Sequence, residues 1–187
     1  MAFISRMIEQ ASWTRFFVWF VILFVFSAWA FNMDSPWTRA LEAAGGVLPE
    51  TKPGIPALEP VRTLDALGDD RRDYILWQLV DIPYALMNFF FASMGMGLGL
   101  KALRLDKSIL RFLLVLPAIY VVCEVIENAL VASFAAKIIA PAEGVVLVQQ
   151  LATSLKFASG MPALLLGVLG AALAFIALLI RLIRKKT

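Results

Sequence analysis

The chain has 187 residues, of which 61% are hydrophobic, with a formal net charge of +3 and a mean hydropathy of +0.82. Soluble domains are nearer half apolar, and here the excess falls in four blocks bounded by charged residues, which is typical of a membrane protein. One cysteine and no histidine exclude an intrachain disulfide, thiolate-based zinc and iron–sulfur sites, histidine-ligated haem and His-based catalytic triads. We therefore expect no metal and no cofactor. The positive charge needs no nucleic acid to explain it, because the basic residues lie where a membrane protein carries them.

Each of the four apolar blocks is long enough for the roughly 20 residues that cross a bilayer core. They predict an all-α fold, a membrane-embedded four-helix bundle that forms a single transmembrane domain over residues 1–187. The predicted spans are about 14–33, 74–100, 111–136 and 157–181. The first block also fits a cleavable signal peptide, but its many Phe and Trp residues favour an uncleaved helix.

The distribution of Lys and Arg predicts the orientation of these spans. Basic residues gather in the N-terminal arm, in the connection between the second and third spans, and in the C-terminal tail. Four crossings put all three on one side, so we expect both termini in the cytoplasm, with a bacterial inner membrane as the location. The connection 34–73 carries more acidic than basic residues and is predicted to be a long outer loop.

Two of the predicted spans carry polar residues at helical spacing. On the second span the polar positions are Tyr74, Gln78, Asp81, Tyr84 and Asn88, and on the third they are Tyr120, Glu124, Glu127 and Asn128. At a rise of about 1.5 Å per residue, the two stripes overlap in depth in the outer half of the bilayer. Thr153 and Lys156 lie just before the fourth span, on the same side, so the stripes are expected to converge on a polar cavity.

Carboxylates inside a bilayer call for a functional hypothesis, because inserting one costs at least about 2.5–3.5 kcal/mol. A neutral carboxyl beside an ionised one suits general acid–base chemistry, so Asp81, Glu124 and Glu127 are the candidate catalytic residues. The candidate ligand-binding residues are Tyr84, Asn88, Asn128 and Lys156. The alternative is that these side chains hold helices together by hydrogen bonds, with Lys156 at the level of the lipid head groups.

Small residues also have two explanations. Gly95 and Gly99 match a close-packing motif of membrane helices, but they equally fit the C-terminal end of a helix. Ala163, Gly167 and Ala171 lie on one face of the fourth span, which favours tight packing within or between subunits.

The order of the polar motifs resembles a recurrent type of small bacterial four-span protein. The motifs are Leu64-Asp65-x-Leu67-Gly68, Arg71-Arg72-x-Tyr74, Asp81-xx-Tyr84, Glu124-xx-Glu127-Asn128 and Thr153-xx-Lys156. The resemblance covers most of the chain from residue 60 onward and implies a fold and a set of polar positions, without an activity. The acid-lined four-helix layout is also similar in shape to the sterol-isomerase and sigma-2-receptor superfamily, which is an analogy of fold alone.

Three functions fit these patterns. The first is a protein that binds or transforms a lipid or isoprenoid by carboxylate acid–base chemistry, with membrane lipids as its partners. The second is a proton- or cation-coupled transporter that acts as a homo-oligomer, and the third is a non-catalytic membrane scaffold. The first ranks ahead, because the polar residues gather in one zone instead of following a path through the membrane.

Overall fold

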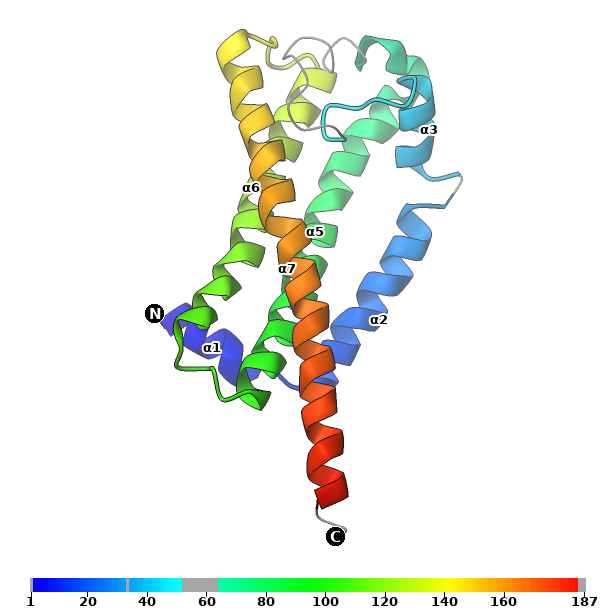
Figure 1. The fold of residues 1–187 in the computed structure, drawn as a ribbon. Coiled ribbons are helices and arrows are strands. Elements are labelled where there is room, and N and C mark those ends of the chain that lie inside the picture. The colour runs from blue at the N-terminus through cyan, green and yellow to red at the C-terminus, as the bar shows by residue number, and fades with distance from the viewer. Residues whose placement is uncertain (1, 33, 52–63, 185–187) are drawn as a thin grey trace. The chain divides into compact units, whose positions relative to one another are not determined.

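The computed structural model describes residues 2–32, 34–51 and 64–184, and its regular structure is helical throughout these ranges (Figure 1). The fold is therefore all-α, as the sequence predicted. The helices in chain order are α1 (Ala2–Gln10), α2 (Trp13–Ala30), α3 (Pro36–Ala43), η1 (Leu64–Asp70), α5 (Arg71–Ala102), η2 (Ile109–Leu114), α6 (Val115–Ala135) and α7 (Glu143–Arg184).

Four helical segments are long and apolar enough to cross a membrane, which indicates a multi-pass membrane protein. They are Trp13–Ala30, Leu64–Ala102, Ile109–Ala135 and Glu143–Arg184. Many of their exposed side chains are large and apolar, Phe24 and Met161 among them, as expected where lipid replaces water as the solvent. The last helix begins at Glu143, whereas the sequence predicted a span from residue 157. Thr153 and Lys156 therefore lie on α7 itself and not before it.

The chain divides into two compact units. The described residues of unit 1 are 2–23, 87–119 and 159–184, and those of unit 2 are 24–32, 34–51, 64–86 and 120–158. Helices α2, α5, α6 and α7 each contribute residues to both units. All the ionisable side chains that are buried among the described residues belong to unit 2.

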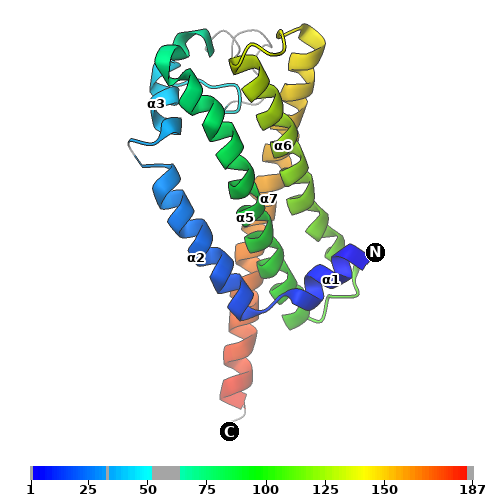
Figure 2. The same ribbon diagram turned by 180° about the vertical axis from the view of Figure 1, so that it is seen from behind.

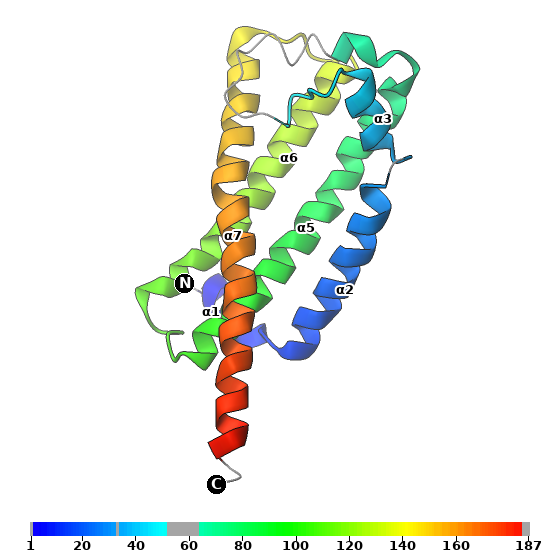
Figure 3. The same ribbon diagram turned by 45° about the vertical axis from the view of Figure 1, so that its right-hand side comes forward.

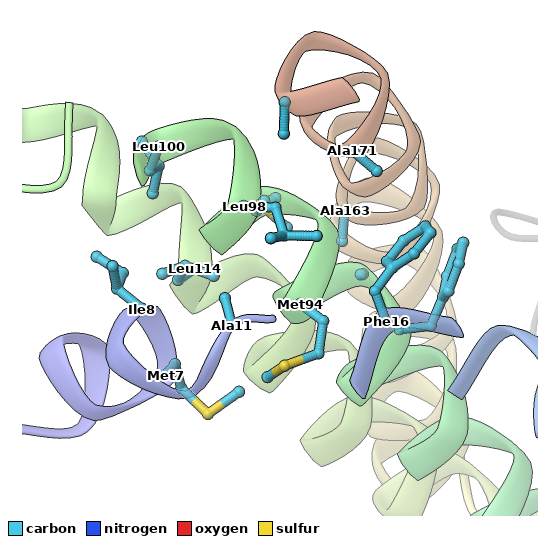
Figure 4. Close-up of a cluster of buried hydrophobic side chains, with 14 of the residues drawn as sticks. Met7, Ile8, Ala11, Phe16, Met94, Leu98, Leu100, Leu114, Ala163 and Ala171 are labelled. Carbon is cyan, nitrogen blue, oxygen red and sulfur yellow. The ribbon is translucent and has the colours of Figure 1, made fainter. Parts of the chain in front are cut away.

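The core of unit 1 is apolar, and the short helix α1 contributes to it (Figure 4). Met7 and Ile8 of α1 are buried in the same cluster as Met94 and Leu98 of α5. Lys101 donates hydrogen bonds to the main-chain oxygens of Glu9 (2.9 Å) and Ala11 (2.8 Å), and so satisfies carbonyls at the end of α1. From the sequence, the residues before the first predicted span were expected only to form a basic arm, and this helix was not predicted.

Glycines let α5 and α7 approach closely in unit 1. A Cβ on Gly95 would collide with the main chain of Gly167, and one on Gly99 would lie 2.6 Å from the Cα of Gly170. Helix α5 continues to Ala102, beyond these glycines. Of the two explanations left open, close packing is the one the structure supports, and the contact lies within one chain.

Unit 2 is built around the N-terminal half of α5, with α3 beside η1 (Figure 2). Ser35 caps α3 by accepting a hydrogen bond from the main-chain N–H of Thr38. Arg39 then links α3 to the start of α5 through Asp73 (2.6 Å) and to Asp70 (3.6 Å). Figure 3 shows the short connection that joins the end of α6 to the start of α7.

A second apolar cluster places the described part of the loop after α3. Leu48 is fully buried together with Tyr74 of α5, Val131 of α6 and Val146 of α7. This packing holds the loop residues next to it, including Glu50, against the helices. The predicted outer loop 34–73 thus contains α3 and η1, and its residues 52–63 lie outside the described part of the chain.

Candidate functional site

The buried charged residues of unit 2 form one cluster with the partly exposed Asp81 and several polar side chains, and we call it the acid cluster. Its members are Glu50, Tyr74, Gln78 and Asp81, then Glu124, Glu127 and Asn128 of α6, and Gln149, Thr153 and Lys156 of α7. Spacings of three and four residues place each helix's members on one face, while Leu79, Ile126 and Leu155 on other faces are exposed. The sequence predicted these stripes on the second and third spans.

Lys156 is the cation at the centre of the cluster. Its side chain is only 10% exposed and lies within salt-bridge distance of both acids of α6. The ammonium donates directly to Oε2 of Glu127, and its distance to Oε1 of Glu124 is 3.4 Å. The structure therefore brings Lys156 together with Glu124 and Glu127, two of the predicted site residues.

Glu127 is the most completely satisfied carboxylate of the cluster. It is 0% exposed, and the hydroxyl of Thr153 donates to its Oε1 while Lys156 donates to its Oε2. Gln149, one turn earlier on α7, donates in turn to the Thr153 hydroxyl at 2.9 Å. This chain of donors fixes Glu127, so its charge serves as the anchor of the cluster.

Glu50 brings a further carboxyl into the cluster from the loop after α3. The side chain is buried, and its oxygens accept hydrogen bonds from the Tyr74 hydroxyl (2.7 Å) and the Gln78 amide (3.2 Å). Gln149 also donates to the main-chain oxygen of Pro49 at 3.4 Å. Burial raises the pKa of Glu50 from an ordinary 4.5 to about 7, although the Tyr74 hydrogen bond opposes the shift.

Asp81 forms the partly exposed end of the cluster. Its Oδ2 accepts a hydrogen bond from the Asn128 amide at 3.4 Å, and its carboxyl lies close enough to Glu124 to interact with it. Glu124, by contrast, is 3% exposed. Asp81 and Glu124 are thus a pair of neighbouring carboxyls, one buried and one accessible.

The cluster contains more acceptors than donors. Within the described part of the chain, the cluster has four carboxyl groups, those of Glu50, Asp81, Glu124 and Glu127, and one cation, that of Lys156. Three buried oxygens accept no hydrogen bond from the described residues: Oε2 of Glu124, Oδ1 of Asn128 and Oε1 of Gln78. Since buried polar atoms are normally satisfied, the arrangement is suited to a group that brings hydrogen-bond donors or positive charge.

Two predicted ligand-binding residues have other surroundings. The ring of Tyr84 stacks on Phe26 of α2 at 5.5 Å, and its hydroxyl oxygen accepts a hydrogen bond from Ser27 at 3.5 Å. Asn88 is buried in unit 1, whereas the acid cluster belongs to unit 2. The polar stripe on α5 therefore contributes to the cluster through Tyr74, Gln78 and Asp81.

Two members of the site, Glu50 and Gln149, were not predicted from the sequence. Glu50 carries no local signal, because only the packing of Leu48 brings its loop to the helices. Gln149 does carry one, since it lies four residues before Thr153 and seven before Lys156, but the predicted span began after it. Among the residues that the structure describes, no three Asp, Glu or Cys side chains are placed to hold a metal ion.

No protein family model, no curated protein and no solved structure matches the chain. The resemblance to small bacterial four-span proteins therefore stays a prediction, and the acid cluster itself is the basis for assigning a function.

Proposed function

We propose that this chain is a membrane protein that binds a lipid or isoprenoid through the acid cluster, by a head group that donates hydrogen bonds. The observation that carries the proposal is the pair of unsatisfied buried acceptors, Oε2 of Glu124 and Oδ1 of Asn128, beside the partly exposed Asp81. A hydroxyl or ammonium group placed there would supply the missing donors.

The charge of the cluster selects against an anionic head group. Among the residues that the structure describes, its carboxyls outnumber its cations, and Lys156 already pairs with Glu127 and Glu124. A phosphate with net negative charge would meet carboxylates in a buried setting, where like charges repel strongly. The ligand class is therefore an amphiphile whose polar end is neutral or cationic.

The exposure of Asp81 supports access from outside the bundle. Its side chain is partly exposed, whereas the other carboxyls of the cluster are buried. Exposed apolar side chains such as Leu79 lie on other faces of the same helices and are expected to face lipid. The head group of an amphiphile would therefore reach the cluster at Asp81 while its apolar tail stays in the bilayer.

Within this proposal the carboxyls have different roles. Glu127 is the fixed charge, because Lys156 and Thr153 hold both its oxygens. Asp81 and Glu124 are the pair that exchanges a proton with the bound head group, since one is accessible and the other has an unsatisfied oxygen. This pair is the basis for any acid–base transformation of the ligand.

The proposal places the protein in a bacterial inner membrane with both termini in the cytoplasm, on the strength of the Lys and Arg distribution. A coupled transporter is less well supported. Unit 1 has no buried ionisable side chain among its described residues, with Asn88, Ser93 and Ser159 as its buried polar ones. A proton or cation path is expected to continue through both units.

The test is native mass spectrometry of the protein extracted with its own lipids. We expect a discrete bound amphiphile on the wild type, reduced at least about tenfold in Glu124→Gln and Asp81→Asn, because each variant removes a carboxylate that receives the head group. Glu143→Gln is the matched control, since it removes the same charge from an exposed position on α7. Absence of a bound species on the wild type, or equal retention by all variants, would contradict the proposal.

A further inference from the structure

A pocket of about 310 Å³ lies in unit 2 apart from the members of the acid cluster. It is formed where α6 ends, where the connection to α7 begins, and where η1 meets α5. Its polar side chains are Asp65, Arg71 and Lys137, and its apolar walls include Leu64, Phe134 and Ile139. The volume is at the lower end of the range of small-ligand pockets.

The charged groups that the structure describes in the pocket carry an excess of positive charge. Arg71 and Lys137 both face Oδ1 of Asp65, at 3.7 Å and 3.8 Å, which is too long for hydrogen bonds. The guanidinium of Arg71 also donates to the main-chain oxygen of Leu64 at 3.1 Å, which fixes its position. In the described lining of the pocket, two cations therefore share one loosely held acid, which is the reverse of the charge balance among the described members of the acid cluster.

Lys137 occupies a backbone position that favours glycine. Its φ is 58°, in the left-handed region, and the main-chain N–H groups of Lys137 and Ile138 donate to Phe134 and Ser133 to end α6. Glycine is the usual residue at such a helix end, because a side chain in the left-handed region is strained. A lysine at this position puts a cation on the rim of the pocket that glycine would not supply.

The pocket also lies at the end of a candidate span, which ends at Ala135. Ile138, the next residue after Lys137, is 78% exposed, and Ile139 on the pocket wall is 38% exposed. Exposed isoleucines beside basic side chains are suited to the boundary of a bilayer, where the lipid phosphates lie. This position favours a lipid over a water-soluble ligand.

We propose that this pocket binds the phosphate of an anionic ligand through Arg71 and Lys137, and that an anionic phospholipid is the source. The site is independent of the acid cluster, whose surplus of carboxylates selects the opposite charge. Asp65 limits the affinity, because it competes with the phosphate for the same two cations.

The experiment measures binding of phosphatidylglycerol to the delipidated full-length protein by native mass spectrometry, with phosphatidylcholine as the lipid control. We expect Lys137→Gln and Arg71→Gln each to weaken binding about fivefold, and Asp65→Asn to strengthen it about fivefold. Arg72→Gln is the control, because this exposed neighbour of Arg71 carries the same charge outside the pocket lining. Misfolding would weaken binding of phosphatidylglycerol in both variants, so weaker binding by Lys137→Gln together with stronger binding by Asp65→Asn is not expected from it.

Inorganic phosphate separates the two possible sources. If it displaces phosphatidylglycerol from the wild type and binds more weakly alone, the lipid is the ligand as proposed. If phosphate alone binds with the same dependence on Lys137 and Asp65 while the lipid does not, the phosphate site stands and its lipid source is wrong. The proposal would be overturned if both lipids bound equally, or if all four variants bound phosphatidylglycerol equally. Neither result would bear on the function proposed for the acid cluster, since none of the substituted residues belongs to it.

Discussion

Replacing Lys156 with methionine tests whether the acid cluster is charged and paired as its geometry implies. Methionine keeps most of the volume of the side chain but removes the cation that Glu124 and Glu127 share. Breaking a buried ion pair by removing one partner typically costs about 3–5 kcal/mol, because the other charge stays buried without compensation. For a chain of this size, such a loss lowers the midpoint of thermal unfolding by about 10 °C.

The only cysteine supplies the assay. Cys123 is buried on α6, one residue before Glu124, so a thiol-reactive fluorophore reports the opening of the helix that carries both acids. Lys107→Met is the control for loss of one positive charge, since Lys107 is exposed. We expect its unfolding midpoint to stay within about 2 °C of the wild type, as surface substitutions usually do.

The double variant Lys156→Met, Glu127→Gln isolates the interaction between the two residues. With both charges gone, more than half of the loss seen in Lys156→Met is expected to return, because no uncompensated carboxylate remains at position 127. The reasoning fails if Lys156→Met melts like the wild type, or if the double variant is no more stable than the single one.

Two further perturbations address the loop carboxyl and the glycine contact. The pKa of Glu50 is about 7 in the folded protein and has an ordinary value of 4.5. The free energy of unfolding therefore has its full contribution from Glu50 below about pH 4.5, and it falls by about 3 kcal/mol as pH rises to 7. In Glu50→Gln, the unfolding midpoint should therefore vary less with pH between pH 5 and 8, as measured by scanning fluorimetry. An unchanged pH profile would refute Glu50 as the cause of the pH dependence. Gly95→Val should destabilise the protein by about 1–3 kcal/mol, because the new side chain would meet the main chain of Gly167. Gly144→Ala should not, because the space around Gly144 is open. Equal unfolding midpoints for the two variants would contradict the close contact.

The sequence predicted the parts of this molecule that depend on local periodicity. The stripes on α5 and α6 follow from spacing alone. On a regular helix, residues three and four positions apart lie on the same face, so Asp81 lies on the face of Tyr74 and Gln78. The apolar blocks likewise predicted the four long helices, because a run of such length has few alternatives.

What the sequence did not predict depends on tertiary contacts. The first turns of α7 hold Gln149 and Thr153 among apolar residues, so the hydropathy falls and the span was predicted to begin at residue 157. Glu50 enters the acid cluster only because Leu48 packs against α5, α6 and α7. Helix α1 is short, and its stability comes from packing on α5 and from Lys101, neither of which is visible in nine residues of sequence.

The contrast between the two units bears on why the acid cluster exists. Lipid tails are as apolar as leucine, so membrane helices associate through close packing and interhelical hydrogen bonds and not through the hydrophobic effect. In unit 1, α5 and α7 associate through Gly95, Gly99, Gly167 and Gly170 without a buried charge among the described residues. The same two helices carry Gln78, Asp81 and Lys156 in unit 2, where a run of small residues would have joined them without burying ions. Replacing buried ion pairs by well-packed apolar residues is often neutral or stabilising. Helix association alone therefore does not account for the four carboxyls that the described residues gather with Lys156, which is the reason for proposing a ligand that needs them.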